Sequence, residues 1–332
     1  MSEAILVTGG AGYIGSHTCK TLARAGYLPV VYDNLSTGHA YAVKWGPFLQ
    51  GDLNNRVKLN EAFELYQPKA VIHFAADAIV TESMKDPGKY YRNNVGSTVA
   101  LLEAMQAHGV KKLVFSSTCA LYGHPEFIPI TEKHPVLPIN PYGRSKWMDE
   151  MILADFGMAH GIEPVVLRYF NAAGADLETE IGEHHSPETH LIPAVIQAAL
   201  GLREEIVVYG TDFQSKDGSA VRDFIHVQDL AEAHVAALKA KSETINLGTG
   251  TGYSVLEIID AVQTFCGQKI QVRLENRRPG EPGVLTADHT LAKHHLGWTP
   301  RCSDLPTLIE SAWKWHQLLF ENAHLVRSVL KC

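Results

Sequence analysis

Several features that would assign a protein to a class at once are absent from this sequence. It has no basic tract, and its formal net charge of -7 argues against a nucleic-acid-binding surface. No apolar run approaches the ~20 residues that cross a membrane, and the N-terminus lacks the basic segment and cleavage site of a secretory signal. We therefore expect a cytoplasmic protein that binds neither nucleic acid nor membranes.

Cysteine is scarce, and its spacing gives no sign of disulfides or of a metal site. The cysteines are odd in number and scattered, and no C-x-x-C occurs, which fits reduced thiols. Although there are 17 histidines, no H-E-x-x-H occurs, and neighbours such as His184 and His185 point to different sides of any regular element. We therefore expect no metal. The cysteines are Cys19, Cys119, Cys266, Cys302 and Cys332.

What the sequence does contain is an alternation of short apolar runs with stretches of helical periodicity. Short apolar runs of this kind predict buried parallel strands. Strands that alternate with helices predict a parallel sheet covered on both faces, which is a doubly wound α/β fold. His73 lies inside one run, and we expect it to be a hydrogen-bonded core residue. The predicted strands are residues 4–8, 28–32, 48–52, 70–76, 112–118, 164–168 and 244–248, the last of which returns to the same sheet.

A glycine-rich turn follows the first predicted strand. Gly9, Gly12 and Gly15 form G-x-x-G-x-x-G, in which glycines allow a tight turn and close approach of the backbone to a pyrophosphate. The pyrophosphate would lie on the N-terminus of the next helix. Asp33 ends the second strand, about 20 residues on, where a carboxylate accepts from an adenosine ribose hydroxyl. No basic residue lies beside Asp33, so the pattern favours NAD over NADP; the alternative is that Asp33 is only a turn residue.

Tyr142 and Lys146 are four residues apart, so they share one face of a helix that Asn140 would cap and Pro141 would begin. A phenol beside an ammonium suits proton transfer, because a nearby cation lowers the pKa of tyrosine from its usual value of about 10. Ordinary surface helices also produce this spacing, so the pair alone does not assign catalysis. Thr118 ends a predicted strand, at the sheet edge where doubly wound folds bind ligands.

The regular alternation of strands and helices ends after residue 170, and the pattern of the second half predicts a second lobe. Its elements are a loop at 171–193, a helix at 191–202, a short strand at 206–209, an extended stretch at 221–227, a helix at 229–240, a glycine-proline segment at 277–283 and a final helix at 306–322. We predict an NAD-binding Rossmann domain of residues 1–170 plus 224–249, and a second, smaller α/β substrate domain of residues 171–223 plus 250–332.

A series of short motifs runs along the whole chain. They are Thr8-Gly9-x-x-Gly12-x-x-Gly15, Asp33-Asn34-Leu35, His73-Phe74-Ala75-Ala76, Tyr91-Arg92-Asn93-Asn94-Val95, Ser116-Ser117-Thr118, Tyr142-x-x-x-Lys146, Arg168-Tyr169-Phe170-Asn171, Val221-Arg222-Asp223-Phe224-Ile225-His226-Val227 and Asn246-Leu247-Gly248. In content and order they resemble the extended short-chain dehydrogenase/reductases, and within them the UDP-glucose 4-epimerase family. The resemblance implies an isomerase that interconverts UDP-galactose and UDP-glucose through a 4-keto intermediate with tightly bound NAD.

The resemblance also implies residue roles. Tyr142 matches the catalytic base, Lys146 the partner that lowers its pKa and holds the ribose, and Thr118 the hydroxyl that positions the sugar oxygen. The implied NAD contacts are Gly9, Gly12, Tyr13, Ile14, Gly15, Asp33, Asn34, Asp52, Leu53, Phe74, Asn93, Tyr142, Lys146 and Phe170. The implied UDP-hexose contacts are Thr118, Asn171, His190, Leu191, Val207, Tyr209, Arg222, Arg278 and Glu281.

The two arginines come from distant segments and suit a diphosphate, which binds forked donors well, although a lone Arg222 or Arg278 is more often a surface ion-pair member. The resemblance further implies a homodimer formed through the helices near residues 90–108 and 142–159.

Some positions depart from the family pattern. Thr118 stands where many members have serine, His190 where some have asparagine, and no lysine lies near Ala78. Leu285 falls at the gate for a sugar acetamide, and its intermediate size leaves epimerisation of UDP-N-acetylhexosamines or UDP-pentoses as an alternative. A 4,6-dehydratase would need carboxyl groups directly after Thr118, where none occurs. A non-catalytic NAD-sensing protein is the alternative from another class.

Overall fold

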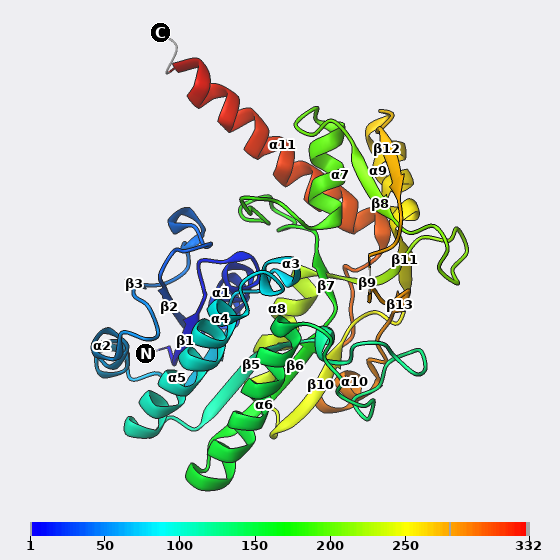
Figure 1. Ribbon diagram of the computed structural model, residues 1–332. Helices are drawn as coiled ribbons and strands as arrows, with labels where there is room; N and C mark the ends of the chain where they lie inside the picture. The colour runs from blue at the N-terminus through cyan, green and yellow to red at the C-terminus, as the bar shows by residue number, and fades with distance from the viewer. Residues whose placement is uncertain (1, 279, 330–332) are drawn as a thin grey trace.

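A seven-stranded parallel sheet forms the centre of the computed structural model, which describes residues 2–278 and 280–329 (Figure 1). Its strand order is β10-β6-β5-β4-β1-β2-β3, and every neighbouring pair is parallel. The predicted doubly wound sheet is confirmed, including the return of the late strand to it. The strands are β1 Ala4–Thr8, β2 Leu28–Asp33, β3 Phe48–Gln50, β4 Ala70–His73, β5 Lys112–Thr118, β6 Glu163–Tyr169 and β10 Glu243–Leu247.

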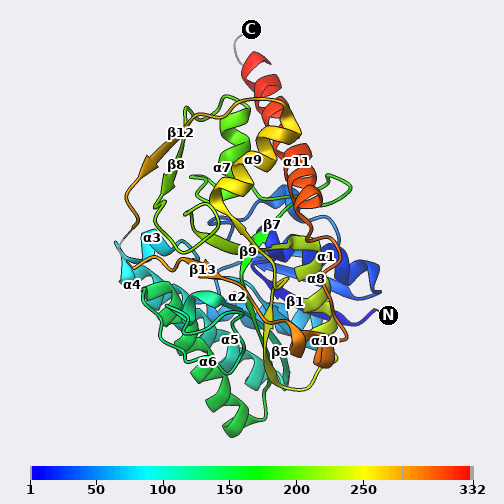
Figure 2. The same ribbon diagram turned by 90° about the vertical axis from the view of Figure 1, so that its right-hand side faces the viewer.

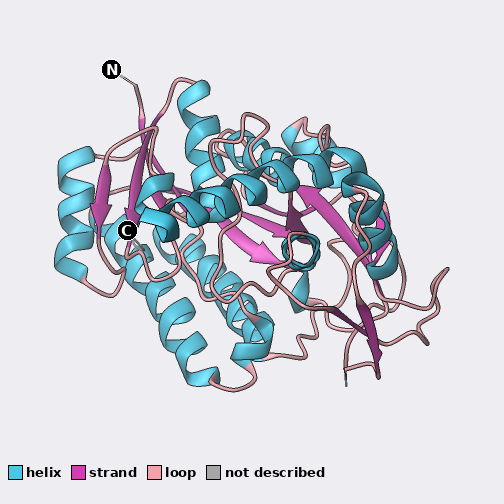
Figure 3. Cartoon of the chain, turned by 90° about the horizontal axis from the view of Figure 1, so that it is seen from above, coloured by secondary structure: helices cyan, strands magenta, loops and turns pink. Residues whose placement is uncertain are grey.

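Helices cover both faces of this sheet (Figure 3). Successive side chains of a strand point to opposite faces, so Leu6 of β1 packs in one core cluster while Ile5 and Val7 pack in the other. The helices on the first side are α2 Arg56–Tyr66, α5 Gly96–Ala107 and α6 Pro141–His160, and those on the second side are α1 Tyr13–Arg24, α8 Val227–Ala237 and α10 Thr290–Leu296.

A second group of elements surrounds a separate core cluster above the edge of the main sheet (Figure 2). A small mixed sheet contains β7 Asn171–Ala173, β9 Val221–His226, β11 Gly252–Ser254 and β13 Val284–Leu285, and a two-stranded sheet contains β8 Ile206–Tyr209 and β12 Val272–Glu275. The helices are α7 Leu191–Ala199, α9 Val255–Cys266 and α11 Leu305–Val329. None of the described helices combines the length and hydropathy of a membrane span.

Several short or irregular elements differ from the sequence predictions. The predicted loop at 171–193 begins with β7, whose three residues are too few to produce a periodicity. The predicted helix at 90–108 is divided into α4 Pro87–Tyr90, a π-helical turn at Tyr91–Val95 and α5. No helix or strand was predicted in the segment 250–296, where α9, β12, β13 and α10 form. Yet α9 begins with a complete capping box of Ser254 and Glu257, a signal that the sequence contained.

The remaining differences concern bounds and short turns. Short helices form at α3 Val80–Ser83, Ala40–Ala42 and Cys119–Leu121, and α11 continues past the predicted end at 322. The strand β9 crosses the predicted domain boundary at 223/224, and the division into domains stays a prediction. Pro279 and Cys332 lie outside the described residues.

A buried ion pair fastens α6 to the sheet. Arg168 on β6 donates through Nε to Glu150 Oε1 at 2.9 Å, and a second bond joins Nη2 to Oε2, which makes the pair bidentate. Their side chains are 6% and 5% exposed, so neither charge has water as an alternative partner. Arg168 also donates to the Tyr122 hydroxyl at 3.0 Å, and Ser117 donates to Glu150. The position of α6 on the sheet therefore depends on a fully enclosed charge pair.

The replacement Arg168→Met should lower the free energy of unfolding by about 3–5 kcal/mol, because Glu150 would keep a buried charge without its partner. The double variant R168M/E150M should recover much of that loss, since no charge then remains buried. Urea denaturation followed by circular dichroism measures both. A single variant as stable as the wild type, or a double variant no better than the single, would contradict the role given to this pair.

Several histidines are buried in the core, where burial favours the neutral imidazole. His73 on β4 lies 2.6 Å from the Thr8 hydroxyl and 3.3 Å from the Thr98 hydroxyl, so the expectation of a hydrogen-bonded core residue is confirmed. Burial, assisted by the charge of Lys146, lowers the pKa of His73 to about 3. Burial also lowers the pKa values of His17 and His234 to about 4. As the pH falls below about 6.5, the unfolded chain takes up these protons first, so stability falls with pH.

For His73 the loss covers the window from about pH 6.5 down to about 3, with a slope of up to about 1.4 kcal/mol per pH unit. The variant His73→Gln should therefore show a shallower fall in unfolding free energy between pH 6 and pH 4 than the wild type. The exposed His124 provides the control, because His124→Gln should leave the slope unchanged. Equal slopes for wild type and His73→Gln would refute this assignment.

Candidate active site

The residues with predicted roles gather at the carboxyl ends of the parallel strands. Gly9 follows β1, Phe74 follows β4, Thr118 ends β5 and Asn171 lies just beyond β6. The order of the sheet places β1, β4, β5 and β6 side by side, so residues far apart in sequence meet along one edge. This is the edge at which doubly wound sheets bind their ligands.

The glycine turn after β1 has no room for side chains. Gly9 has φ +73°, and a Cβ there would lie 2.6 Å from the backbone nitrogen of Ala75. A Cβ on Gly15 would lie 2.2 Å from the Gly9 carbonyl oxygen. Gly12 caps α1 without a side-chain hydrogen bond, and the first turn of α1 holds no acidic residue, so its N–H groups can receive an anion. These features fit the pyrophosphate of a dinucleotide.

Asp33 ends β2 next to this turn in a fixed orientation. Its Oδ2 accepts from the Ala11 N–H at 3.0 Å and its Oδ1 from the Leu35 N–H at 2.8 Å. Burial raises the pKa of the Asp33 carboxyl, and these two bonds counteract that effect. Asn34 donates to Asp52 at 2.9 Å, so two predicted cofactor residues are in contact. The arrangement offers a carboxylate where an adenosine ribose would need one.

Further predicted cofactor residues surround the turn. Asn93 lies in the π-helical turn and donates to Asp77 at 2.9 Å, and the Phe74 ring lies 4.6 Å from that of His234. The Tyr13 hydroxyl donates to the Gly174 carbonyl at 2.6 Å, which joins the glycine turn to the segment after β7. Leu53 and Phe170 are buried, and Ile14 packs partly buried against the sheet core.

Thr118, Tyr142 and Lys146 form a second group at the same edge. Asn140 caps α6 by accepting from the Gly143 N–H, so the predicted start of this helix is confirmed. Burial raises the pKa of the Tyr142 phenol above its usual value, while a hydrogen bond with Thr118 works in the opposite direction. Burial lowers the pKa of Lys146, whose Nζ lies 4.7 Å from the centre of the Phe115 ring. The chain's own groups therefore favour an uncharged phenol.

Asp149 was not identified from the sequence, although it lies one helical turn after Lys146. Its side chain is fully enclosed, and burial raises the pKa of its carboxyl to about 6 against the opposing charge of Lys146. The spacing of three residues from Lys146 on a helix is the signal that could have found it. A buried acid thus accompanies the buried base in α6.

The predicted substrate residues fall into separate groups. Arg222 on β9 donates to Glu281 at 3.1 Å, and the Arg278 guanidinium lies 3.8 Å from the centre of the Tyr209 ring. Leu285 on β13 is the register partner of Arg222. Asn171, Val207 and Leu191 lie on β7, on β8 and at the first position of α7. Arg222 with Glu281 and Arg278 with Tyr209 are thus in direct contact, and the remaining predicted substrate residues lie on neighbouring elements.

His190, the residue before α7, lies among carboxylates. Its Nδ1 lies 2.7 Å from Glu183 Oε1 and 3.0 Å from Glu188 Oε1. Although burial opposes it, the charges of Glu183 and Glu188 raise the pKa of His190 to about 11. Both glutamates lie in the predicted loop at 171–193, where no motif distinguished them.

Comparison with known proteins supports the same chemistry. The model of the NAD-dependent epimerase/dehydratase family matches residues 5–248. A UDP-glucose 4-epimerase of Rhizobium meliloti (strain 1021) is 52% identical over 317 residues, which cover 94% of this chain and 96% of that protein.

Two solved structures show the same fold. The UDP-glucose 4-epimerase from Brucella ovis in complex with NAD has 50% identity and a TM-score of 0.92, over 94% of this chain and 98% of that one. The enzyme from Bifidobacterium longum in complex with NAD+ and UDP has 38% identity and a TM-score of 0.90, over 95% and 98% of the two chains. The chain therefore belongs to the NAD-dependent epimerase/dehydratase family, as its sequence motifs predicted.

Proposed function

We propose that this chain is an NAD-dependent UDP-sugar 4-epimerase that interconverts UDP-galactose and UDP-glucose through a 4-keto intermediate. The observation that carries the proposal is the placement of Thr118, at the end of β5, with Tyr142 and Lys146, in the first turns of α6, at the same sheet edge as the glycine turn. The relatives at 50% and 52% identity, which are named UDP-glucose 4-epimerases, support it.

The proton steps belong to Tyr142. NAD, when bound, supplies the hydride chemistry by taking a hydride from carbon 4 of the sugar and returning it to that carbon. Tyr142 loses its proton more readily when a positive charge enters the pocket, and it then removes the proton of the 4-hydroxyl. Thr118 holds the sugar oxygen in reach of the phenolate. Lys146 donates to the ribose and adds a positive charge beside the phenol.

The second group of residues holds the nucleotide while the sugar turns over. Arg222 and Arg278 are the expected donors to the UDP diphosphate, since each guanidinium offers a fork of N–H groups. Burial lowers the pKa of Arg222, and the charge of Glu281 counteracts that effect. An anchored UDP allows a flat 4-keto sugar to present its other face to the cofactor before the hydride returns. Dehydratase chemistry is disfavoured because Cys119 and Ala120, after Thr118, carry no carboxyl group.

We also propose a homodimer in the cytoplasm. Met148, Met151 and Met158 are 39%, 43% and 81% exposed, and their spacing places them on one side of α6, the helix that the family resemblance assigns to the dimer interface. Cys19, Cys119, Cys266 and Cys302 are free thiols, which supports a reducing compartment.

The purified protein should convert UDP-galactose to UDP-glucose without added cofactor. NADH should not accumulate, so the absorbance at 340 nm should not rise. Chromatography of the nucleotide sugars measures the product. Parallel reactions with UDP-N-acetylgalactosamine and a UDP-pentose test the alternative substrates. If UDP-galactose is not converted with or without added NAD, but an N-acetylated UDP-sugar is, that sugar is the substrate. If none of the three UDP-sugars is converted, the NAD-sensing alternative is favoured.

The variant Tyr142→Phe should lose about 10²–10⁴-fold in turnover, because phenylalanine lacks the hydroxyl that exchanges a proton with the 4-hydroxyl in the proposed function. Its affinity for UDP, measured by calorimetry, should stay close to that of the wild type. Tyr90 provides a matched control, since its ring packs edge-on against Tyr142 at 6.4 Å and its hydroxyl donates to Ile79 instead. Turnover in Tyr142→Phe equal to that in Tyr90→Phe would exclude Tyr142 as the base.

A further inference from the structure

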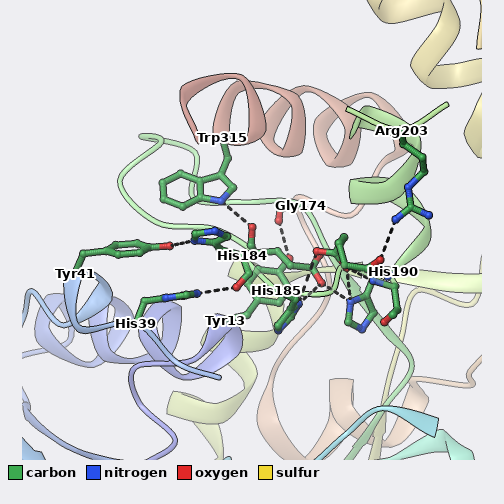
Figure 4. Close-up of polar contacts among 12 residues, drawn as sticks. Tyr13, His39, Tyr41, Gly174, His184, His185, His190, Arg203 and Trp315 are labelled. Carbon is green, nitrogen blue, oxygen red and sulfur yellow. Dashed lines mark hydrogen bonds and ion pairs between the residues drawn. The ribbon is translucent and has the colours of Figure 1, made fainter. Parts of the chain in front are cut away.

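Two glutamates and two histidines converge in the segment between β7 and α7, and we call them the Glu-His cluster. It consists of Glu183, His185, Glu188 and His190 (Figure 4). Each can offer one ligand atom, and these four atoms all lie within 4.8 Å of one another. His184 and His185 do point apart, as predicted: His184 stacks on His39, while His185 faces Glu183. The partner of His185 is instead His190, five residues further on.

The polar atoms of the Glu-His cluster lie at hydrogen-bond and ion-pair distances, close to the separations of ligands around a metal ion. Glu183 Oε1 lies 2.7 Å from His190 Nδ1 and 3.1 Å from His185 Nδ1. Glu188 lies 3.0 Å from His190 through Oε1 and 3.9 Å from His185 through Oε2. Ligands at ~2.1 Å from a tetrahedral zinc ion are about 3.4 Å apart. These four separations, 2.7 to 3.9 Å, lie on both sides of that value, so the side chains would shift by up to about 0.7 Å to complete the shell.

One carboxylate oxygen in the Glu-His cluster independently indicates a missing cation. Glu188 Oε2 is buried and has no hydrogen-bond partner, and the Glu188 side chain is 2% exposed. The other oxygen, Oε1, already accepts from the backbone N–H groups of Thr189 and His190 at 2.8 Å. An unpartnered carboxylate oxygen in a buried position is costly. Since Oε2 faces His185, a cation at the centre of the cluster would satisfy it.

The backbone around the Glu-His cluster is held from several sides. Trp315 on α11 donates to the Glu183 carbonyl at 2.9 Å, and Arg203 donates to the Glu188 carbonyl at 3.0 Å (Figure 4). The Tyr13 ring lies edge-on to His185 at 6.5 Å. Two of the four ligands are therefore held in place by contacts that do not use their side chains, as a metal site requires.

The other acidic group of this region provides a contrast. Asp176, Glu178 and Glu180 also lie close together, but Lys20 Nζ contacts all three at 2.8, 2.7 and 2.6 Å. Lysine already supplies a cation there. The described ion pairs of the Glu183 and Glu188 carboxylates involve only imidazoles and no lysine or arginine, and an imidazole is itself a metal ligand when neutral.

We propose that the Glu-His cluster binds a divalent transition-metal ion, with Zn²⁺ as the best match to two imidazoles and two carboxylates. The ion would be structural, because all four positions are filled by protein. It would tie the segment before α7 into one conformation between Tyr13 of the glycine turn and Leu191 of the predicted UDP site. The proposal does not depend on which sugar is the substrate. An ion has to displace the proton that His190 shares with the glutamates.

The test uses the full chain, stripped with EDTA and dialysed against metal-free buffer, with Zn²⁺ as the probe. Wild-type protein should take up one ion per chain in competition with a chromophoric chelator, and bound Co²⁺ should give the visible absorption of a four-coordinate site. Zn²⁺ should raise Tm by roughly 5 °C at a hundredfold excess over Kd. His185→Gln and Glu188→Gln should each weaken binding by at least about tenfold.

His184 is the matched control, because it has the same side chain and the same loop but lies outside the cluster. It stacks on His39 at 4.4 Å and hydrogen-bonds Tyr41, so His184→Gln should bind Zn²⁺ as the wild type does. Wild-type protein that takes up no Zn²⁺ and shows no shift in Tm would mean that the cluster is only an ion pair around His190, and would overturn the proposal. So would Zn²⁺ uptake that is unchanged in both cluster variants. If Glu188→Gln fails to fold, His185→Gln alone decides.

Discussion

Parallel pairing of the central strands is the constraint on which the rest of the molecule depends. Because β1, β4, β5 and β6 all run in one direction, every connection between them has to cross a face of the sheet, and every strand delivers its last residue to the same edge. The glycine turn, the hydroxyl of Thr118 and the start of β7 meet there for that reason. The Arg168 pair is one attachment of α6 to this sheet, in addition to its apolar packing.

The protonation of Tyr142 shows how strongly burial governs this site. A helical lysine one turn away suggests a lowered phenol pKa, yet enclosure in protein raises the pKa of Tyr142 and lowers that of Lys146. The two shifts oppose the formation of a charged pair in the dry pocket. A phenol in such surroundings becomes a base only when its charge has a partner. In the proposed function, Tyr142 would therefore act as a base only after a bound ligand supplies that partner.

Most of the central sheet could be predicted from the sequence, because its strands are short apolar runs and its first turn is marked by Gly9, Gly12 and Gly15. The helix at Pro141 was equally clear, since its cap and first residue are standard signals. The small mixed sheet was not predicted, because β7 and β13 are too short for any periodicity. The Glu-His cluster was missed for another reason: its members are close only after Ser186 and Pro187 turn the chain, so linear spacing gave no warning.

The hydrogen bond from Tyr13 to the Gly174 carbonyl joins two parts of the molecule with different tasks. Tyr13 belongs to the turn that would carry the dinucleotide, and Gly174 to the segment that leads toward the predicted sugar nucleotide contacts. In an epimerase of this kind, the hydride that NAD takes from the sugar is returned to the same sugar. The cycle has no net redox change only if the reduced cofactor stays bound between the two transfers. In the proposed function, this bond would have to open before a dinucleotide held on the glycine turn could move past the segment after β7. Such an enzyme would keep the same NAD molecule bound through many turnovers.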